Sequence, residues 1–401
     1  MSATTEPNVG SFTLGGPLTA EPAGPIEVPE HDEWTLPNGF AWVFPGEGNH
    51  GLVRPVIMAD GFNLGRSKLD SLYQGLEGGN FPFISELRRR GRDVILLGFE
   101  ERSASILENA QAAEAVIMRA IAEQMGDTRL VVGGFSMGGI VTRYALAKLE
   151  TRRMDHRTGL YFSYDSPHRG ASIPVGVQAF SHFIPFPNDF AKQMNSPAAR
   201  QMLWSHYDKD TDKVGTAPER TEFLAALDRV GSWPQIPMKI AVANGRADGV
   251  GLPDVNPGGV ALRIDQIYPG TTFYTQAQGD DVTAAHLNRR FPKAEKTVTT
   301  SGFPELDGAP GGTLHTYKIL ADTMEKLGGK ADLRHEDVCF VPSVSAVAIR
   351  DIETQDDLYA NIDGLSPDES ELDDFLCSST TSAHTAITEE LCTWLMDRLP
   401  D

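Results

Sequence analysis

The segment 134–138, with the sequence GFSMG, has the residue types and spacing that present a serine hydroxyl for chemistry. It follows a short apolar run, 130–132, and precedes a helical run, 140–149. A G-x-S-x-G pattern between a strand and a helix is a nucleophile elbow, in which flanking glycines make room for a tight turn. The pattern predicts Ser136 as a nucleophile. The alternative is a glycine-rich turn in which Ser136 only caps the helix.

A serine hydroxyl is a weak nucleophile and needs a base to take its proton. Histidine suits this task because its ordinary pKa, about 6.5, lets it accept and return a proton near neutral pH. The chain contains 10 histidines, so residue type alone does not choose among them. A carboxylate must then orient the imidazole and stabilise its protonated form.

The elements around the elbow alternate between apolar strands and amphipathic helices. A helix is expected over 106–121, where Ser105 and Glu108 form a capping box. Apolar runs of strand length occur at 53–59, 94–97, 159–164 and 238–243. This alternation predicts an α/β fold with a mostly parallel central sheet that helices cover on both faces. Before these strands, an Asn-Gly pair at 38–39 predicts a hairpin between the runs 33–36 and 40–44.

Two segments interrupt the alternation. Residues 171–236 are rich in Phe, Pro, Met and Trp, and residues 255–335 alternate apolar and polar in places, as in an added β-rich insertion. Gly311-Gly312 and Gly328-Gly329 predict turns. We divide the chain into a flexible N-terminal arm (1–33), a first core part (34–170), a lid or cap (171–236), a core strand with its loop (237–254), the β-rich insertion (255–335) and a C-terminal core part (336–401).

Several of these motifs resemble those of the α/β-hydrolases, the superfamily of lipases, esterases and thioesterases. The matching stretches are 60–62 (DGF), 134–139 (GFSMGG), 166–170 (SPHRG), 245–248 (GRAD) and 382–384 (SAH). They extend over about 53–395, and the two interrupting segments match nothing specific. The elbow is specific for the superfamily, and none of the motifs is specific for a substrate.

The resemblance implies the chain order serine, acid, histidine, with the histidine after the last strand. His384 fits best, because it follows a Ser/Thr-rich loop and precedes a terminal helix. Asp248 is the first choice as the acid, because it lies at the Gly-x-x-Asp position of the usual acid loop, and Asp165 is its rival. The remaining candidates are His286, His315 and His335 as bases and Asp254 and Asp337 as acids, while His168 is expected to be structural.

The resemblance also implies an oxyanion hole formed by two backbone N–H groups. Met137, the residue after the nucleophile, should supply one of them. The turn of Gly61 and Phe62 should supply the other, with Phe62 as the donor. This chain has Asp60 where related enzymes often have histidine, so Asp60 either repels anionic substrate groups or orders the loop.

The aromatic residues of 171–236 are expected to pack partly on the core and partly around a hydrophobic acyl pocket. The pocket candidates are Phe183, Phe186, Phe190, Met194 and Trp204. We expect a serine hydrolase that cleaves a carboxylic ester or thioester, free or carrier-bound, through an acyl-enzyme. The alternatives are acyl transfer, cyclisation or elimination at the same site, and a non-catalytic binding protein on this scaffold.

Composition limits the classes of partner. The chain has 401 residues, a formal net charge of −20, 40% hydrophobic and 22% charged residues. So acidic a chain repels nucleic acid and anionic membranes. Its sequence contains no apolar run of spanning length and no recognisable signal peptide, and its three cysteines fit reduced thiols, so we expect a cytoplasmic protein. No cofactor and no metal are expected, and no oligomeric state is predicted.

Overall fold

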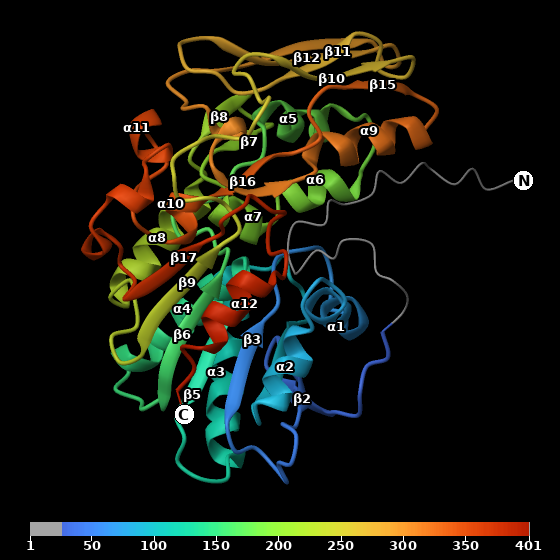
Figure 1. Cartoon of the computed structure of the whole chain (residues 1–401). Helices are drawn as coiled ribbons and strands as arrows, with labels where there is room; N and C mark the ends of the chain where they lie inside the picture. The colour runs from blue at the N-terminus through green and yellow to red at the C-terminus, as the bar shows by residue number, and fades with distance from the viewer. Residues whose placement is uncertain (1–25, 401) are drawn as a thin grey trace, which may run out of the picture.

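The computed structural model describes residues 26–400, so most of the expected arm, 1–33, lies outside the described residues. Its largest element is an eight-stranded sheet (Figure 1). In spatial order the strands are β1 (Asp32–Leu36), β2 (Gly39–Phe44), β4 (Asp93–Phe99), β3 (Pro55–Ala59), β5 (Leu130–Phe135), β6 (Thr158–Tyr164), β9 (Met238–Ala243) and β17 (Asp374–Cys377). The strands from β4 to β17 are parallel, whereas β1 and β2 form the predicted antiparallel hairpin, with Asn38 at φ 57°.

Helices cover both faces of this sheet, as Figure 1 shows. One face carries α3 (Ile106–Glu123) and α4 (Met137–Thr151), and the other carries α1 (Leu69–Glu77), α2 (Phe83–Arg89) and α12 (Glu389–Met396). Every residue of β4 and β5 is buried, as expected for parallel strands with helices on both sides. The mostly parallel, doubly covered sheet confirms the predicted α/β class.

The segment 171–236 contains four helices and one short hairpin. They are α5 (Val175–Phe183), α6 (Asp189–Met194), α7 (Pro197–Met202), β7 (His206–Asp208), β8 (Lys213–Gly215) and α8 (Pro218–Arg229). On α5, the ring of Phe180 meets the rings of Tyr268 and Phe273 edge-on, at centroid distances of 5.0 and 5.5 Å. Part of this apolar segment therefore packs on the segment 255–335.

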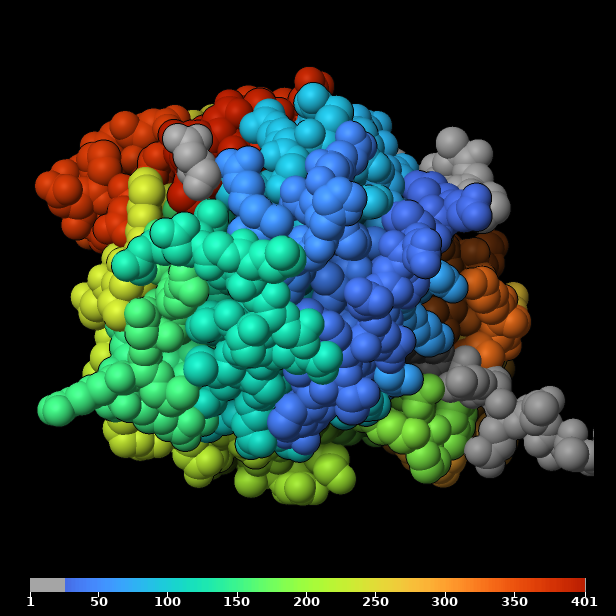
Figure 2. Space-filling model, turned by 90° about the horizontal axis from the view of Figure 1, so that it is seen from below, coloured from blue at the N-terminus to red at the C-terminus, as the bar shows by residue number. Residues whose placement is uncertain are grey.

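The segment 255–335 contributes a five-stranded antiparallel sheet, with α9 (Thr316–Lys326) beside it. Its spatial order is β13 (Ala294–Thr300), β12 (Val282–Arg289), β11 (Thr271–Tyr274), β10 (Val260–Asp265) and β15 (Lys330–Leu333). This sheet lies at the top of Figure 1, above α5 and α9. Figure 2 looks at the opposite end from below, where segments coloured blue to green occupy most of the surface.

One strand of 255–335 does not join that sheet. Gly311 and Gly312 begin β14 (Gly311–Leu314), which pairs with β16 (Val338–Pro342), so the turn predicted from these glycines is wrong. A 3-10 turn at Leu306–Gly308 precedes β14. The C-terminal part contains the short helices α10 (Ser343–Ala346) and α11 (Gln355–Leu358) and two 3-10 turns, at Ile362–Gly364 and Pro367–Glu369. Within residues 26–400, no helix combines the length and the apolar character needed to cross a membrane.

Candidate active site

Ser136 lies at the tip of a tight turn between β5 and α4. Its φ and ψ are 52° and −121°, a strained combination for a residue with a side chain. The flanking glycines are required by space: a Cβ on Gly134 would lie 2.5 Å from the carbonyl carbon of Gly138, and a Cβ on Gly138 would lie 2.3 Å from the carbonyl oxygen of Ala59. The turn therefore has the geometry of the predicted elbow.

The structure brings Ser136, His384 and Asp165 into one chain of hydrogen bonds. His384 Nε2 lies 2.8 Å from Ser136 Oγ, and His384 Nδ1 lies 2.6 Å from Asp165 Oδ2. A carboxylate can only accept, so Nδ1 carries the hydrogen and Nε2 accepts the hydrogen of the serine hydroxyl. The three side chains are at most 1% exposed. This order of groups is the one needed for a nucleophile, a base and an orienting acid.

Asp165 is held where its carboxylate reaches His384. It directly follows β6 and has φ 49°, a left-handed conformation that turns its side chain out of the strand direction. Its backbone N–H donates to Val242 O at 2.7 Å, and its Oδ1 accepts the N–H of Asn244 at 3.0 Å. The carboxylate is therefore fixed by the neighbouring strand β9 as well as by its own.

Asp248, the first choice from the sequence, lies elsewhere. Its carboxylate is ion-paired with Arg246, and it accepts the N–H of Val250 at 3.1 Å. Its side chain remains 31% exposed. Burial opposes ionisation of this group, but the hydrogen bond and the charge of Arg246 outweigh it, so the pKa of Asp248 is lowered. Asp248 closes its own surface loop, and the alternative acid, Asp165, occupies the position beside His384.

Asn244 is a residue of the site that the sequence interpretation overlooked. It is buried, and its Nδ2 donates to Ser382 Oγ at 2.8 Å and to Ala386 O at 2.9 Å. It thereby connects the loop that carries His384 to the end of β9, while its N–H holds Asp165. The available signal was its position, because Asn244 follows β9 as Asp165 follows β6.

Of the three N–H groups considered as oxyanion donors, those of Met137 and Phe62 have no protein acceptor among residues 26–400, and that of Gly61 already has one. Met137 begins α4, and Phe62 lies in the loop after β3. Among residues 26–400, neither backbone N–H donates to a protein acceptor. Gly61 differs, because its N–H donates to Asp60 Oδ1 at 2.8 Å. The Met137 and Phe62 N–H groups are therefore available for a ligand, whereas that of Gly61 is not.

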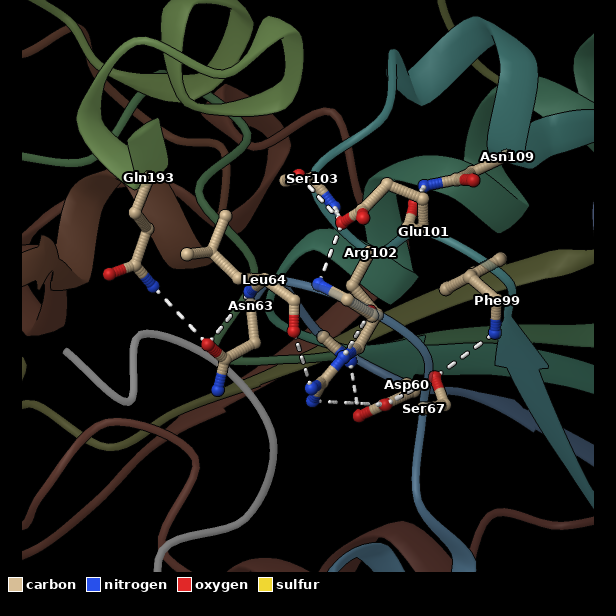
Figure 3. A network of polar contacts seen from close by, with 12 residues as sticks. Asp60, Asn63, Leu64, Ser67, Phe99, Glu101, Arg102, Ser103, Asn109 and Gln193 are labelled. Carbon is tan, nitrogen blue, oxygen red and sulfur yellow. Dashed lines mark hydrogen bonds and ion pairs between the residues drawn. The ribbon is translucent and has the colours of Figure 1, made fainter. Parts of the chain in front are cut away.

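The loop after β3 is held by a buried polar network around Asp60 (Figure 3). Asp60 Oδ2 accepts the hydroxyl of Ser67 at 2.7 Å, and an Arg102 nitrogen lies 3.7 Å away. Burial raises the pKa of Asp60, and the charge of Arg102 partly offsets that effect. Arg102 also donates to Leu64 O at 3.0 Å. Of the two roles considered for Asp60, these contacts support ordering of the loop.

The same loop is tied to the segment 171–236. Asn63 Oδ1, one residue beyond Phe62, accepts the N–H of Leu64 at 2.8 Å and an N–H of the Gln193 side chain at 3.3 Å, as Figure 3 shows. Gln193 belongs to α6 and is buried. Any displacement of α6 therefore acts on the loop that carries the Phe62 N–H.

A small apolar cavity of about 10 Å³ lies beside these groups. It is lined by Phe62, Ala171, Met194, Ala199, Met202, Leu203 and Phe340. The ring of Phe340 also meets the His384 ring edge-on at 4.7 Å, which places the cavity next to the base. Its volume is at the scale of a single water, so a substrate acyl group requires the flexible Met194 and Met202 side chains to move.

Only Met194 among the five expected pocket residues lines this cavity. Phe183 and Phe186 line a separate hollow of about 460 Å³. The Arg289 guanidinium lies over the Phe183 ring. Trp204 packs edge-on against Phe303 at 4.9 Å, and Phe190 is buried in the core. The aromatic residues of 171–236 therefore mainly attach this segment to its surroundings.

His168, His286 and His315 bond away from Ser136. His168 Nε2 lies 2.8 Å from Ser163 Oγ, and burial lowers its pKa well below the usual value, as expected for a neutral structural group. His315 is ion-paired with Asp337, and His286 lies 3.0 Å from Thr297 Oγ1. In the described part of the chain, no group of three or more His, Cys, Asp or Glu side chains could hold a metal ion.

No protein-family model matches the chain, and no curated protein matches it. Among solved structures, the Bacillus licheniformis lipase BlEst2 is 12% identical, over 51% of this chain and 72% of its own, with a TM-score of 0.32. An esterase from Pyrobaculum calidifontis is 12% identical over 54% and 66%, with a TM-score of 0.35. EstE1, a thermostable carboxylesterase cloned from a metagenomic library, is 12% identical over 54% and 80%, with a TM-score of 0.33.

These likenesses are too low to carry an argument about activity, and each covers about half of this chain. The fold is evident from the chain itself. A mostly parallel sheet is covered on both faces, and a serine elbow joins β5 to α4 where parallel strands end. The chain therefore has the α/β-hydrolase fold.

Proposed function

We propose that this protein is a serine hydrolase that cleaves a carboxylic ester or thioester through an acyl-enzyme. The observation that carries the proposal is the unbroken chain of hydrogen bonds from Ser136 Oγ through His384 to Asp165 Oδ2. Each group has the chemistry its place requires, because a hydroxyl needs a base and an imidazole needs an oriented tautomer.

In this mechanism His384 Nε2 takes the hydroxyl proton as Ser136 Oγ attacks the carbonyl carbon. The N–H groups of Met137 and Phe62 donate to the oxygen as its negative charge develops, and Asp165 stabilises the protonated imidazole. His384 then gives its proton to the leaving alcohol or thiol. A water molecule, deprotonated by His384, attacks the acyl-enzyme and releases the acid and the serine.

The apolar cavity beside Phe62 and Phe340 supports an acyl group without charge. All seven residues that line it have apolar side chains, so a charged or strongly polar acyl group would lose hydration there without a partner. The segment 171–236 supplies Met194, Ala199 and Met202 to the lining, which supports its assignment as a cap over the site.

A fluorophosphonate probe followed by peptide mapping tests the proposal. We expect labelling at Ser136 in the parent chain and none in Ser136→Ala. The control is Ser301→Ala, which removes an exposed serine just after β13 and should leave labelling unchanged. Hydrolysis of p-nitrophenyl butyrate should fall with the labelling. Equal labelling of Ser136→Ala and the parent chain would overturn the assignment.

Burial of Ser136 favours one alternative reaction, in which the acyl group is transferred within the substrate and not to water. Ser136 is 1% exposed, so a bound acyl group could be shielded from water and transferred to a hydroxyl or amine of the substrate itself. Product analysis with an acyl thioester that carries an internal hydroxyl distinguishes the two reactions. A lactone as the main product would replace hydrolysis by cyclisation, and a free acid would support hydrolysis.

A further inference from the structure

We propose that strand β14, which lies in the segment 255–335 but pairs with β16, positions the acid and the base of the site, and that Gly312 is its key residue. This inference rests on the proposed function. It gives the segment 255–335 a role in the site, although β14 is far from Ser136 and Asp165 in the sequence. Gly312 touches no substrate atom in this account and acts through the side chain of Asp165.

The first observation is how closely Gly312 approaches Asp165. A Cβ built on Gly312 would lie 2.1 Å from Asp165 Oδ2 and 3.0 Å from its Cγ. Oδ2 is the same atom that accepts the hydrogen of His384 Nδ1 at 2.6 Å. Any side chain at 312 must therefore displace the oxygen that orients the imidazole, because non-bonded atoms cannot overlap so far.

The second observation is a backbone connection between β14 and the histidine loop. The N–H of His384 donates to Thr313 O at 2.7 Å, and the N–H of Thr313 donates to Ser382 O at 3.1 Å. Thr313 and Ala383 form an isolated parallel bridge. Two backbone hydrogen bonds therefore hold the loop of His384 against β14, and they fix the position of the imidazole relative to Asp165.

The third observation is that β14 has no room to retreat. Behind it, β16 pairs with it from Gly311 to Leu314, and a Cβ on Gly311 would lie 2.3 Å from Val341 O. The next residue of β16, Phe340, places its ring against His384 at 4.7 Å. A methyl group at 312 is therefore accommodated by movement of Asp165 and not by movement of the strand.

Gly312→Ala tests the inference, with Gly215→Ala as the matched control, because no atom lies within 4 Å of a Cβ at Gly215. We expect kcat for p-nitrophenyl butyrate to fall on the order of 10- to 100-fold, the scale of a misplaced catalytic group, with KM within about twofold. The low-field proton resonance of the His384–Asp165 hydrogen bond should move or disappear. The control should leave all three readouts unchanged.

A second variant guards against misfolding of Gly312→Ala. Thr313→Pro removes the N–H donated to Ser382, which points away from β16, so the pairing with β16 is retained. It should also lower kcat and not KM. If both variants fold and keep parental kcat and resonance, the inference is wrong. Absence of fluorophosphonate labelling at Ser136 in the parent chain would instead overturn the proposed function.

Discussion

Two aspartate loops at the same edge of the central sheet differ in almost every respect. Asp165 follows β6 and Asp248 follows the adjacent strand β9, so both lie near the carboxyl ends of parallel strands. Asp165 is fully buried and bonds to a histidine 219 residues away. Asp248 is one-third exposed and is paired with Arg246, two residues away.

The difference shows that a local motif does not determine which carboxylate lies beside His384. The GRAD sequence gives Asp248 a cation within its own loop, so its charge is balanced before any long-range contact forms. The loop of Asp165 also carries a cation, Arg169, but Arg169 is ion-paired with Glu371 at 2.7 Å, and the partners of Asp165 are Asn244 and His384. Long-range contacts, and not the local sequence alone, therefore leave the Asp165 carboxylate beside the imidazole.

Exchanging each carboxylate for an amide tests this comparison with the largest expected effect. Asp165→Asn should lower kcat by about four orders of magnitude, because an amide can hold the wrong imidazole tautomer. Asp248→Asn should change kcat by less than about twofold, the small effect expected where a side chain touches nothing that reacts. Steady-state kinetics on p-nitrophenyl butyrate measures both. A larger loss in Asp248→Asn would reverse the assignment.

Asp307 sharpens the comparison, because it is as buried as Asp165 but has no histidine partner. It accepts the Gln276 N–H at 3.0 Å, and burial raises its pKa from 3.8 to about 6. From about pH 4 to pH 6 the folded chain keeps a proton that the unfolded chain has released, so stability falls as the pH rises, by about 3 kcal/mol.

Urea unfolding of the parent chain and of Asp307→Asn at pH 4 and pH 7 measures this contribution. The variant should lack it, so the difference in unfolding free energy between the two proteins should change with pH in the direction given above. Identical pH dependence of the unfolding free energy in both proteins would show that the pKa of Asp307 is not raised in the folded state.

Asp60 is the buried aspartate on the opposite side of the serine. Asp60→Ala releases Gly61 and Ser67, so the Phe62 N–H should lose its fixed direction. We expect kcat to fall about 10- to 100-fold, less than the loss for removing a whole oxyanion donor, which reaches about 1000-fold. Asp228→Ala, on the exposed side of α8, is the control. A change confined to KM would contradict a positioning role for Asp60.

The smallest effect is expected on stability at the Asp248 loop. Exposed ion pairs contribute little, because both side chains are well solvated when separate. Arg246→Ala and Asp248→Asn should each change the unfolding free energy by less than about 0.5 kcal/mol in chemical denaturation. A loss above about 1 kcal/mol would mean that this loop supports the core more than its exposure indicates.

Features with a local cause could be predicted from the sequence. The elbow could be recognised because backbone atoms close to Gly134 and Gly138 leave no room for a side chain, so a turn of this kind requires glycine at both positions. The strands of the central sheet could be located because buried parallel strands are continuous apolar runs. The sequence also predicts His384, from its place before the terminal helix and from the superfamily order, and the structure places it beside Ser136.

Features with a long-range cause could not. Which of Asp165 and Asp248 lies beside His384 depends on which loop β14 and the histidine loop approach, and no local pattern in the sequence indicates that approach. Gly311 and Gly312 were interpreted as a turn, because glycine signals turns far more often than it signals a strand pressed against a carboxylate. Phe183 and Phe186 were recognisably apolar, but composition does not tell which surface they face.

The proposed triad also has a consequence for a chain that has not finished folding. Its serine and histidine are 248 residues apart, and the histidine follows β17, which adds to the sheet edge beside β9. Bringing residues so distant in sequence together costs loop-closure entropy, so we expect this contact to be among the last to form. A newly made or partly unfolded molecule should therefore carry an inert hydroxyl at position 136, and turnover would report completed assembly of the whole domain.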